Sequence, residues 1–369
     1  MYDERWDAAP RRTGRTGRTV AVLLAAALAL VAFLGYQGEL PRWVFGITDS
    51  TATLLGPPLP PMDPAAVAAA VEPELANINV SVRPAGMSAA GSGIVLTADG
   101  QVLTSHHVVK GAESITVSDI GTGGQYPATV LGYDADADIA LLEMSRAADL
   151  PVARIGSSAG LRIGDEVLAI GNAGGTGSPT ATPGTVTALD SSIVARNSAD
   201  YSRKALTGMV EIAAPVTSGQ SGGALADRYG AVVGVITAAS GDNAKAAGRA
   251  SGYAVPIDTA MSVVRQIRSG TASETVHVGP TATLGVITSD AKPVGARIES
   301  AVYGMPAYAA GLTEGEIITG IDGRAVTSMQ SLKGALNLRK PDDTVQLELT
   351  APDGTRRTVA VVLAVGPPN

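Results

Sequence analysis

The most hydrophobic stretch of the chain is a run of twenty residues, 19–38, that contains no charged side chain. At about 1.5 Å of rise per residue, a helix of this length spans about 30 Å, the thickness of one bilayer core. Five arginines precede the run and Glu39 follows it directly. The pattern therefore predicts a single transmembrane helix, with the basic segment 1–18 in the cytoplasm and the rest of the chain on the extracytoplasmic side.

A cleavable signal peptide is the alternative interpretation of this run. It is less favoured because the apolar run is long and no small-residue cleavage site follows the sequence FLGY. Segment 39–64, which comes next, is rich in proline and includes GPPLPPMDP. Such a segment is extended and semi-rigid, so we expect it to be a spacer between the membrane and a globular part that begins near Ala65.

Residues 65–270 alternate short apolar runs with turns that contain Gly, Asp and Pro. The apolar runs include GIVLTADGQVLTS, SITVSD, YPATVLGYD, DEVLAIGN, GTVTALDSS, AVVGVITAAS and SGYAVPID. Many short strands at close spacing predict an all-β sandwich or barrel. A helix is expected near the end of this region, at MSVVRQIRSG, where Gly270 stops the helical spacing.

A second unit is expected over residues 275–366. Its first residues, 275–280, show no regular pattern, and we interpret them as a link between domains. Five further strands are predicted, at GVIT, ARIES, GEIITGIDG, TVQLELT and RRTVAVVL. Helices fit at PAYAAG and at TSMQSLKGALNL, so this unit is expected to be a small α+β domain.

The composition narrows the chemistry that this chain can perform. The 369 residues contain no cysteine, which excludes disulfides, thiolate zinc sites and a cysteine nucleophile. Only three histidines are present, so imidazole chemistry must use one of them. The net charge is −7, and no basic segment of the kind that binds nucleic acid follows the N-terminal arginines. The acidic residues near Asp136 are not followed by the glycine and the closing glutamate of an EF-hand, so they do not predict a calcium site. We therefore expect no cofactor, no metal and no nucleic-acid partner.

The sequence GQSGG, residues 219–223, places a serine between glycines. It fits both the nucleophile elbow of α/β-hydrolases and the active-site loop of chymotrypsin-like proteases. An α/β-hydrolase needs a histidine after the serine, and the one candidate, His277, falls in the expected link. The order His, Asp, Ser remains, with His106 or His107 followed by an aspartate of GYDADADIALLEM and then by Ser221. This order favours the chymotrypsin-like arrangement, and it disfavours an esterase.

Five ordered motifs carry a resemblance to a known family. They are GSGIVLTADGQVLTSHHVVKG, DADADIALLEM, GDEVLAIGNAGG, GQSGGALADRYGAVVGVITA and SGYAVPID. In this order they resemble the trypsin-like protease domain of the HtrA/Deg family, and the terminal unit resembles the PDZ domain of that family. The resemblance covers about residues 65–365, and membrane-bound members also have an N-terminal anchor and spacer. It implies a mostly-β fold: a chymotrypsin-like double β-barrel over residues 65–270, followed by a PDZ domain and preceded by a transmembrane helix.

The resemblance also assigns roles within the motifs. It implies that His107 is the general base and Ser221 the nucleophile, while His106 falls at a variable position. It implies that Asp138, at the start of an apolar run, is the carboxylate that orients the base, whereas Asp134 and Asp136 are expected to be solvated. These roles agree with the chemistry, because a serine hydroxyl needs an imidazole to remove its proton and the imidazole needs a carboxylate to hold its tautomer.

Two further groups of residues complete the expected protease site. The backbone N–H groups of Gly219 and Ser221 are expected to form the oxyanion hole. Pro215 and Val216 occupy the position where enzymes that cut after Lys or Arg hold an aspartate, so we expect small or medium aliphatic residues on the acyl side of the cut. Gln220 replaces the aspartate of zymogen-activated trypsins, so regulation is expected to be conformational.

The terminal domain contains a candidate site for peptides. The sequence TLGV resembles the carboxylate-binding loop of PDZ domains, which implies that backbone N–H groups of Leu284, Gly285 and Val286 capture a chain terminus. Leu332 and Leu336, four residues apart on the last predicted helix, either line the side-chain pocket of this site or belong to the ordinary core.

Together these observations predict a membrane-anchored, ATP-independent serine endopeptidase that cleaves misfolded or exposed extracytoplasmic proteins, with its activity regulated by peptide binding to the PDZ domain. The expected partners are unfolded polypeptides or protein C-termini, the membrane, and further copies of the chain, since the family commonly forms trimers. The alternative is a catalytically slack, chaperone-like protein that binds peptides through its PDZ domain. The complete set of catalytic residues favours the peptidase, because a binding module needs none of them.

Overall fold

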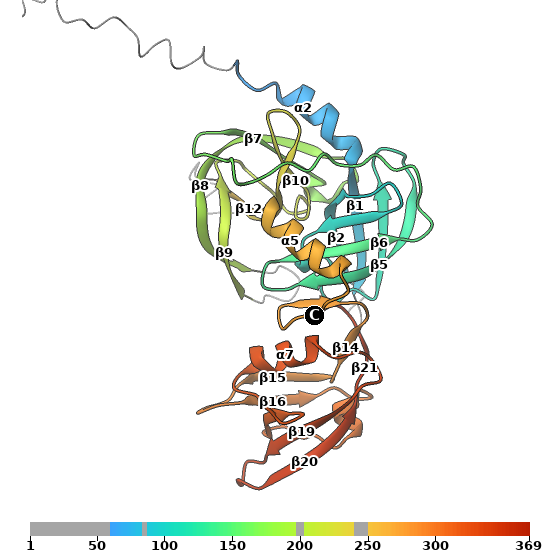
Figure 1. Cartoon of the computed structure of the whole chain (residues 1–369), viewed down its shortest axis with the longest axis vertical. Coiled ribbons are helices and arrows are strands. Elements are labelled where there is room, and N and C mark those ends of the chain that lie inside the picture. The colour runs from blue at the N-terminus through green and yellow to red at the C-terminus, as the bar shows by residue number, and fades with distance from the viewer. Residues whose placement is uncertain (1–59, 83–86, 197–202, 240–249) are drawn as a thin grey trace, which may run out of the picture. The chain divides into compact units, whose positions relative to one another are not determined.

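The computed structural model describes residues 60–82, 87–196, 203–239 and 250–369, of which Met62–Asn369 form one compact unit (Figure 1). The predicted cytoplasmic segment 1–18 and transmembrane helix 19–38 lie outside the described residues, as does the spacer up to residue 59. Within the described ranges, no helix has the length and apolar character needed to cross a membrane.

The first part of the chain forms a β-barrel. Its strands are β1 (Leu75–Val82), β2 (Met87–Val95), β3 (Gln101–Thr104), β4 (Ser114–Asp119), β5 (Gln125–Asp134) and β6 (Ile139–Met144). They pair in the order β5-β4-β1-β2-β3-β6, and an additional pairing between β5 and β6 closes the ring. Several of the apolar runs predicted to be strands form this barrel. Residues that point inward, such as Ile78, Val117 and Leu142, are fully buried, as the alternation of side chains along a strand requires.

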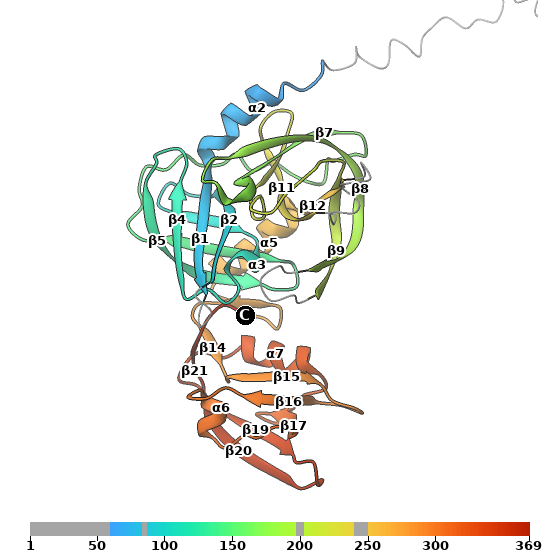
Figure 2. The same cartoon turned by 180° about the vertical axis from the view of Figure 1, so that it is seen from behind.

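A second, closed barrel follows (Figure 2). Its strands are β7 (Glu166–Gly171), β8 (Thr180–Arg196), β9 (Arg203–Ile212), β10 (Ala224–Asp227), β11 (Val232–Ala239) and β12 (Gly252–Pro256). A hydrophobic cluster joins the two barrels, since Ile94 and Leu141 of the first belong to the same buried cluster as Leu168 and Val235 of the second; each barrel also has a cluster of its own. The double barrel is therefore mostly β, as the sequence predicts.

Two helices pack against this shared core. Helix α2 (Pro64–Val71) begins where Asp63 accepts hydrogen bonds from two backbone N–H groups, and Pro64 occupies its first turn. Helix α5 (Ile257–Arg268) buries one apolar face, with Ala260, Val264 and Ile267 in the core. Helix α5 occurs where the sequence predicts a helix. Because α5 contacts β5, β6, β11 and β12, it joins the two barrels.

The terminal domain is α+β. It contains β14 (Thr281–Thr283), β15 (Val286–Asp290), β16 (Ala296–Ala301), α6 (Pro306–Ala309), β17 (Ile317–Ile321), β18 (Arg324–Ala325), α7 (Met329–Asn337), β19 (Thr344–Thr350), β20 (Arg356–Val362) and β21 (Ala364–Gly366). The main sheet has the order β15-β16-β17-β19-β20, so β15 is an edge strand. Strands β14 and β21, which were not predicted, pair with each other in a separate ribbon.

The interpretation of residues 275–280 as a link without regular structure is wrong. Strand β13 (Val276–Val278) pairs with β5 and extends the sheet of the first barrel. The side chain of His277 is buried, and both its ring nitrogens lie within hydrogen-bond distance of backbone carbonyl groups. Three residues are too few to show a period of two, which is why the sequence pattern did not reveal this strand.

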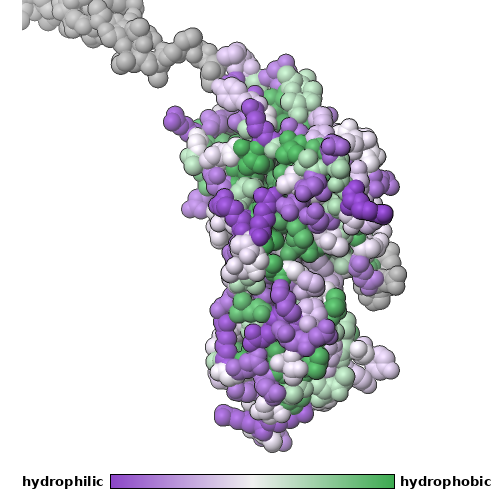
Figure 3. Space-filling view, turned by 45° about the vertical axis from the view of Figure 1, so that its right-hand side comes forward, coloured by the Kyte–Doolittle hydropathy of each residue, from purple (hydrophilic) through white to green (hydrophobic). Residues whose placement is uncertain are grey.

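The surface of the described residues carries polar and apolar side chains side by side (Figure 3). Large apolar residues are exposed in both parts, among them Ile163 in the double barrel and Tyr303 in the terminal domain, where Tyr303 packs edge-to-face against exposed Tyr308. Exposed apolar residues are normal on a folded protein.

Arg357→Ala is expected to destabilise the terminal domain by about 2–3 kcal/mol. Arg357 donates two hydrogen bonds of 2.8 Å to the carboxylate of Glu316, whose side chain is only 4% exposed, so the substitution leaves a buried charge without its partner. Urea unfolding checks this prediction. Arg324→Ala is the matched control, because the Arg324–Glu274 ion pair is exposed on both sides and should contribute less than about 1 kcal/mol. Equal losses in the two variants would contradict the prediction.

Candidate active site

His107 and Asp138 come from two neighbouring connections of the first barrel. His107 lies on the short helix α3 (His106–Val109) that follows β3, and Asp138 lies in the turn between β5 and β6. Asp138 has a left-handed backbone conformation, with φ of 59°. The turn is closed by Asp134, whose carboxylate accepts hydrogen bonds from the N–H groups of Asp136 and Ala137. Because of this capping role Asp134 is buried, so the expectation that it is solvated is wrong; Asp136 is exposed.

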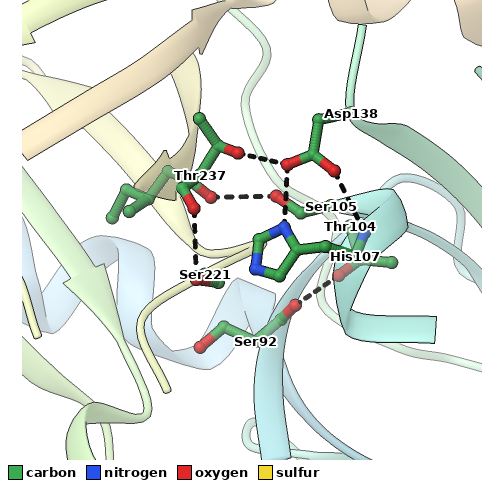
Figure 4. Close-up of polar contacts among 8 residues, drawn as sticks. Ser92, Thr104, Ser105, His107, Asp138, Ser221 and Thr237 are labelled. Atoms are coloured by element: carbon green, nitrogen blue, oxygen red, sulfur yellow. Dashed lines mark hydrogen bonds and ion pairs between the residues drawn. The ribbon is translucent and has the colours of Figure 1, made fainter. Parts of the chain in front are cut away.

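The side chains of His107 and Asp138 form a close pair (Figure 4). The Nδ1 atom of His107 lies 2.8 Å from Oδ2 of Asp138, and the backbone N–H of His107 donates to Oδ1 over 3.0 Å. A carboxylate held in this way fixes both the orientation and the tautomer of the imidazole.

Burial and charge act in opposite directions on this pair. Burial alone would lower the pKa of His107, but the charge and hydrogen bond of Asp138 outweigh it, so the pKa is raised above its usual value. Burial would raise the pKa of Asp138, yet His107 and its hydrogen bond hold that pKa far below the usual range. The carboxylate is therefore ionised at neutral pH and stabilises an imidazolium on His107.

Thr237 is a member of this site that sequence reasoning missed. Its hydroxyl donates a hydrogen bond to Oδ2 of Asp138, the oxygen that also contacts His107 (Figure 4). Thr237 is buried on β11, within the run AVVGVITAAS that was interpreted only as an apolar strand. The sequence did contain one indication of this contact: a single hydroxyl at an inward position of an apolar strand. Buried hydroxyl groups have hydrogen-bond partners, so a partner for Thr237 could have been expected.

Ser221 lies at the edge of the second barrel and faces this pair. Figure 4 shows the imidazole of His107 between the Asp138 carboxylate and Ser221. The Ser221 hydroxyl lies 3.4 Å from the carbonyl oxygen of Thr237, the residue that also contacts Asp138. The structure thus brings His107 and Asp138 into contact and places Ser221 beside them, with its hydroxyl directed to the Thr237 carbonyl.

The other two histidines are packed elsewhere. His106 is buried and stacks on Tyr133, with a distance of 4.7 Å between ring centroids. Burial lowers the pKa of His106 to about 3, so its ring is neutral at physiological pH. His277 also contacts Tyr133, with a distance of 5.1 Å between ring centroids, and burial lowers its pKa as well. Neither ring has a hydrogen bond to Ser221 or Asp138 among the described residues.

The loop before Ser221 presents a free backbone donor. The N–H of Gln220 donates to the carbonyl of Thr217 over 3.2 Å, and Gly219 has φ of 93°, so residues 217–220 form a tight turn that needs glycine. The carbonyl of Ser218 accepts a 2.7 Å hydrogen bond from the N–H of Gly174. Since the two polar groups of a trans peptide point in opposite directions, the N–H of Gly219 points away from Gly174. This N–H has no acceptor within the described ranges.

Gln220 ties this loop to the barrel. Its side chain is buried; Oε1 accepts from the N–H of Thr217 and Nε2 donates to the carbonyl of Thr180. Of the two residues expected at the specificity pocket, Val216 is buried against Gly252 and belongs to the core of the second barrel, whereas Pro215 is exposed.

The expected peptide site of the terminal domain lies beside edge strand β15. Leu284 is buried, Gly285 has φ of 74°, and half-buried Val286 begins β15. Met305 packs against Gly285, where a Cβ atom would collide with it. On α7, Leu332 is buried in the domain core and Leu336 is partly buried against it.

A double β-barrel with a histidine, an aspartate and a serine gathered between its halves is the architecture of a trypsin-like serine protease, and here it is joined to a small α+β domain. Comparison with protein families gives the same result. Residues 91–235 match the trypsin-like peptidase domain, and residues 282–363 match the PDZ domain.

Individual relatives extend this comparison. The chain is 33% identical to "Serine protease PepD" of Mycobacterium tuberculosis over 323 residues, which cover 83% of this chain and 67% of that protein. It is 30% identical to a "Probable periplasmic serine endoprotease DegP-like" of Pseudomonas fulva, covering 75% of this chain and 56% of the relative. A solved "HtrA-type protease AlgW with tripeptide" aligns with 83% of this chain and 98% of its own, at 26% identity and a TM-score of 0.48.

The chain therefore belongs to the HtrA/Deg family of trypsin-like serine proteases with a C-terminal PDZ domain. It spans about two thirds of the length of the first of these relatives and little more than half of the second.

Proposed function

We propose that this protein is a serine endopeptidase in which Ser221 attacks the peptide carbonyl, His107 transfers the proton and Asp138 orients and stabilises the imidazole. The observation that carries the proposal is that the Asp138 carboxylate contacts both His107 and Thr237. The Ser221 hydroxyl lies next to this group, at the carbonyl of Thr237. A carboxylate buried in this way makes the imidazole a stronger base at the moment when it removes the serine proton.

The reaction then follows from the positions of these groups. Attack by Ser221 Oγ turns the carbonyl oxygen into an oxyanion while His107 holds the serine proton. The N–H groups of Gly219 and Ser221 donate to that oxyanion, and the free donor on Gly219 supports this role. His107 next gives its proton to the leaving amine, and a water molecule releases the acyl group from Ser221 by the same steps in reverse order.

The substrates of this reaction are proposed to be unfolded or exposed extracytoplasmic polypeptides, cleaved without ATP. The two curated relatives described above carry the names of serine proteases, one of them periplasmic. Pro215 and Val216 carry no charge at the expected pocket, which supports cleavage after small or medium aliphatic residues. The uncharged run 19–38 supports a membrane anchor that holds domains 65–270 and 275–366 outside the cytoplasm, with 39–64 as the spacer.

The PDZ domain is proposed to bind protein C-termini and to regulate the protease. Strand β15 is an edge strand, so its outer backbone groups can pair with an added peptide strand. Leu284, Gly285 and Val286 precede or begin this strand, and their N–H groups are proposed to bind the terminal carboxylate. The N–H of Gly285 donates to the Thr283 hydroxyl over 3.3 Å, so peptide binding would exchange this acceptor for the carboxylate. Assembly into trimers is proposed from the family alone.

The protease assignment is tested with the soluble chain from residue 60 onward, incubated with unfolded casein and, separately, with a fluorophosphonate probe. The expected result is fragmentation of casein and labelling of Ser221, and the variant Ser221→Ala should show neither. If the unsubstituted chain is folded by circular dichroism yet cleaves nothing and takes up no probe, the peptidase proposal is wrong.

The activity is expected to fall on the acid side with a midpoint above pH 6.5, the usual pKa of histidine. The base must be neutral to accept the serine proton, and the Asp138 partner raises the pKa of His107, so protonation inactivates the enzyme at a higher pH than an isolated imidazole would show. His106 and His277 have lowered pKa values and do not titrate in this range. The measurement is kcat/KM on a chromogenic peptide from pH 5 to 9; a midpoint below 6 would contradict the prediction.

A further inference from the structure

Ser92 is a buried serine at which the two barrels meet. It lies on β2 of the first barrel, within the sequence GSG, and is 1% exposed. Its hydroxyl donates a 2.8 Å hydrogen bond to the carbonyl of Gly219 and accepts another of 2.8 Å from the N–H of Asn172. Gly219 and Asn172 both lie in loops of the second barrel, so the Ser92 hydroxyl connects β2 to two of these loops.

The backbone of Ser92 makes two more contacts in the same place. Its N–H donates to the carbonyl of Ser221 over 2.8 Å, and its own carbonyl accepts from the hydroxyl of Thr104 over 2.7 Å (Figure 4). Space around it is tight, because a Cβ atom on Gly171 would lie 2.7 Å from the Ser92 hydroxyl. Ser92 is therefore held on several sides by the residues around it.

The hydrogen bond from the Ser92 hydroxyl fixes one of the two peptide groups that flank Gly219. The peptide before Gly219 is held by the hydrogen bond from Gly174 to the carbonyl of Ser218. The peptide after Gly219 is held by the hydrogen bond from Ser92 to the carbonyl of Gly219. A glycine has no side chain to resist rotation of its flanking peptides, so its orientation depends on these two external contacts.

The two contacts are also linked to each other. Asn172, which donates to Ser92, begins the turn that contains Gly174, and the N–H of Gly175 donates back to the carbonyl of Asn172 over 3.0 Å. The Asn172 side chain accepts from the N–H of Gly177, which closes the same turn. The Ser92 hydroxyl thus holds Gly219 directly and also holds the turn that orients Ser218.

We propose that Ser92 is a positioning residue for the oxyanion hole: its hydroxyl holds the loop 217–220 with the Gly219 N–H free to meet the developing oxyanion. The inference rests on the proposed peptidase reaction and adds to it a residue outside the motif GQSGG. The Ser92 side chain is buried and contacts neither His107 nor the Ser221 hydroxyl, so its hydroxyl acts through the geometry of Gly219.

The test compares kcat and KM of Ser92→Ala with those of the unsubstituted chain on a chromogenic peptide. The variant leaves the Gly219 carbonyl and the Asn172 N–H without their buried partner, and kcat is expected to fall about 10- to 100-fold, less than for outright loss of an oxyanion donor. KM should change less than about threefold, because the ground-state carbonyl depends little on this donor.

Two further readouts separate positioning from a general structural effect. The affinity for a peptide boronic acid, whose tetrahedral adduct carries the oxyanion, should fall in parallel with kcat. The acid limb of the pH profile should stay in place, because the contact between His107 and Asp138 is untouched. Ser191→Ala is the matched control: it removes a half-buried hydroxyl that bonds to Glu211 in the second barrel, and it should leave kcat and boronate affinity unchanged.

Ser92→Cys keeps the inference testable if Ser92→Ala does not fold. The chain contains no other cysteine, and a thiol is a weaker donor and acceptor in nearly the same volume, so kcat should fall about threefold or more. A folded Ser92→Ala or Ser92→Cys with full kcat, or a rise in KM alone, would overturn the positioning role. If instead the unsubstituted chain cleaves no peptide, it is the peptidase proposal that fails.

Discussion

His107→Ala is expected to lower kcat on a peptide substrate by a factor on the order of 10⁶, to the level reached when the whole set of catalytic groups is removed. Without the imidazole, nothing accepts the proton of Ser221, and the ionised Asp138 carboxylate keeps only its contacts with Thr237 and the backbone N–H of residue 107. The measurement is the single-turnover rate with a chromogenic peptide, together with the rate of labelling by a fluorophosphonate.

His106→Phe is the matched control for this variant. Phenylalanine preserves the stacking on Tyr133 and removes the neighbouring imidazole, and Nε2 of His106 has no hydrogen-bond partner among the described residues. Activity should therefore stay within about threefold of the unsubstituted chain, as for a change that touches no reacting group. If His106→Phe were inactive while His107→Ala still cleaved, the roles of the two adjacent histidines would be exchanged.

Gly219→Ala is expected to lower kcat by about 10²–10³, the cost of losing one oxyanion donor. An added Cβ would collide with the carbonyl oxygen of Asn172, and φ of 93° is strained for any residue with a side chain. The loop must therefore rotate, and the Gly219 N–H leaves the direction in which it is free. Affinity for a peptide boronic acid should fall by the same factor, whereas binding of uncleaved peptide should not.

Gly164→Ala offers a control of matched backbone strain. Gly164 has φ of 94°, but no atom lies within 4 Å of the position that its Cβ would occupy. The Gly164→Ala variant should lose about 1 kcal/mol of its free energy of unfolding and keep its full kcat. A comparable loss of activity in both variants would show that strain, rather than the oxyanion loop, caused the effect.

Much of the fold was predictable because its signals are local. Strands such as β4 and β19 alternate buried and exposed residues along their length, and a period of two is visible in a single sequence. Helix α5 shows a period near 3.6 and ends before Gly270. Chain order then excluded His277, and the family resemblance selected His107 over His106; the structure brings His107 to the predicted Asp138. The roles of these residues remain predictions.

The features that the sequence did not predict depend on contacts between distant residues. Thr237 contacts Asp138 across 99 residues, and Ser92 contacts Gly219 across 127, so neither contact has a trace in local spacing. Asp134 was expected to be solvated because its neighbours are polar, but the turn that it caps buries it. The strand at 276–278 is defined by its pairing with β5 and not by its own composition.

The core shared by the two barrels has a consequence for the order of events after synthesis. Ile94, Leu141, Leu168 and Val235 pack in one cluster, and the chemistry is divided across it, with His107 on one side and Ser221 on the other. Contacts between residues this far apart in sequence close long loops, which makes them slow to form. A chain whose second barrel is unfolded holds His107 and Asp138 without a positioned Ser221, so the proposed peptidase reaction requires both barrels to be complete.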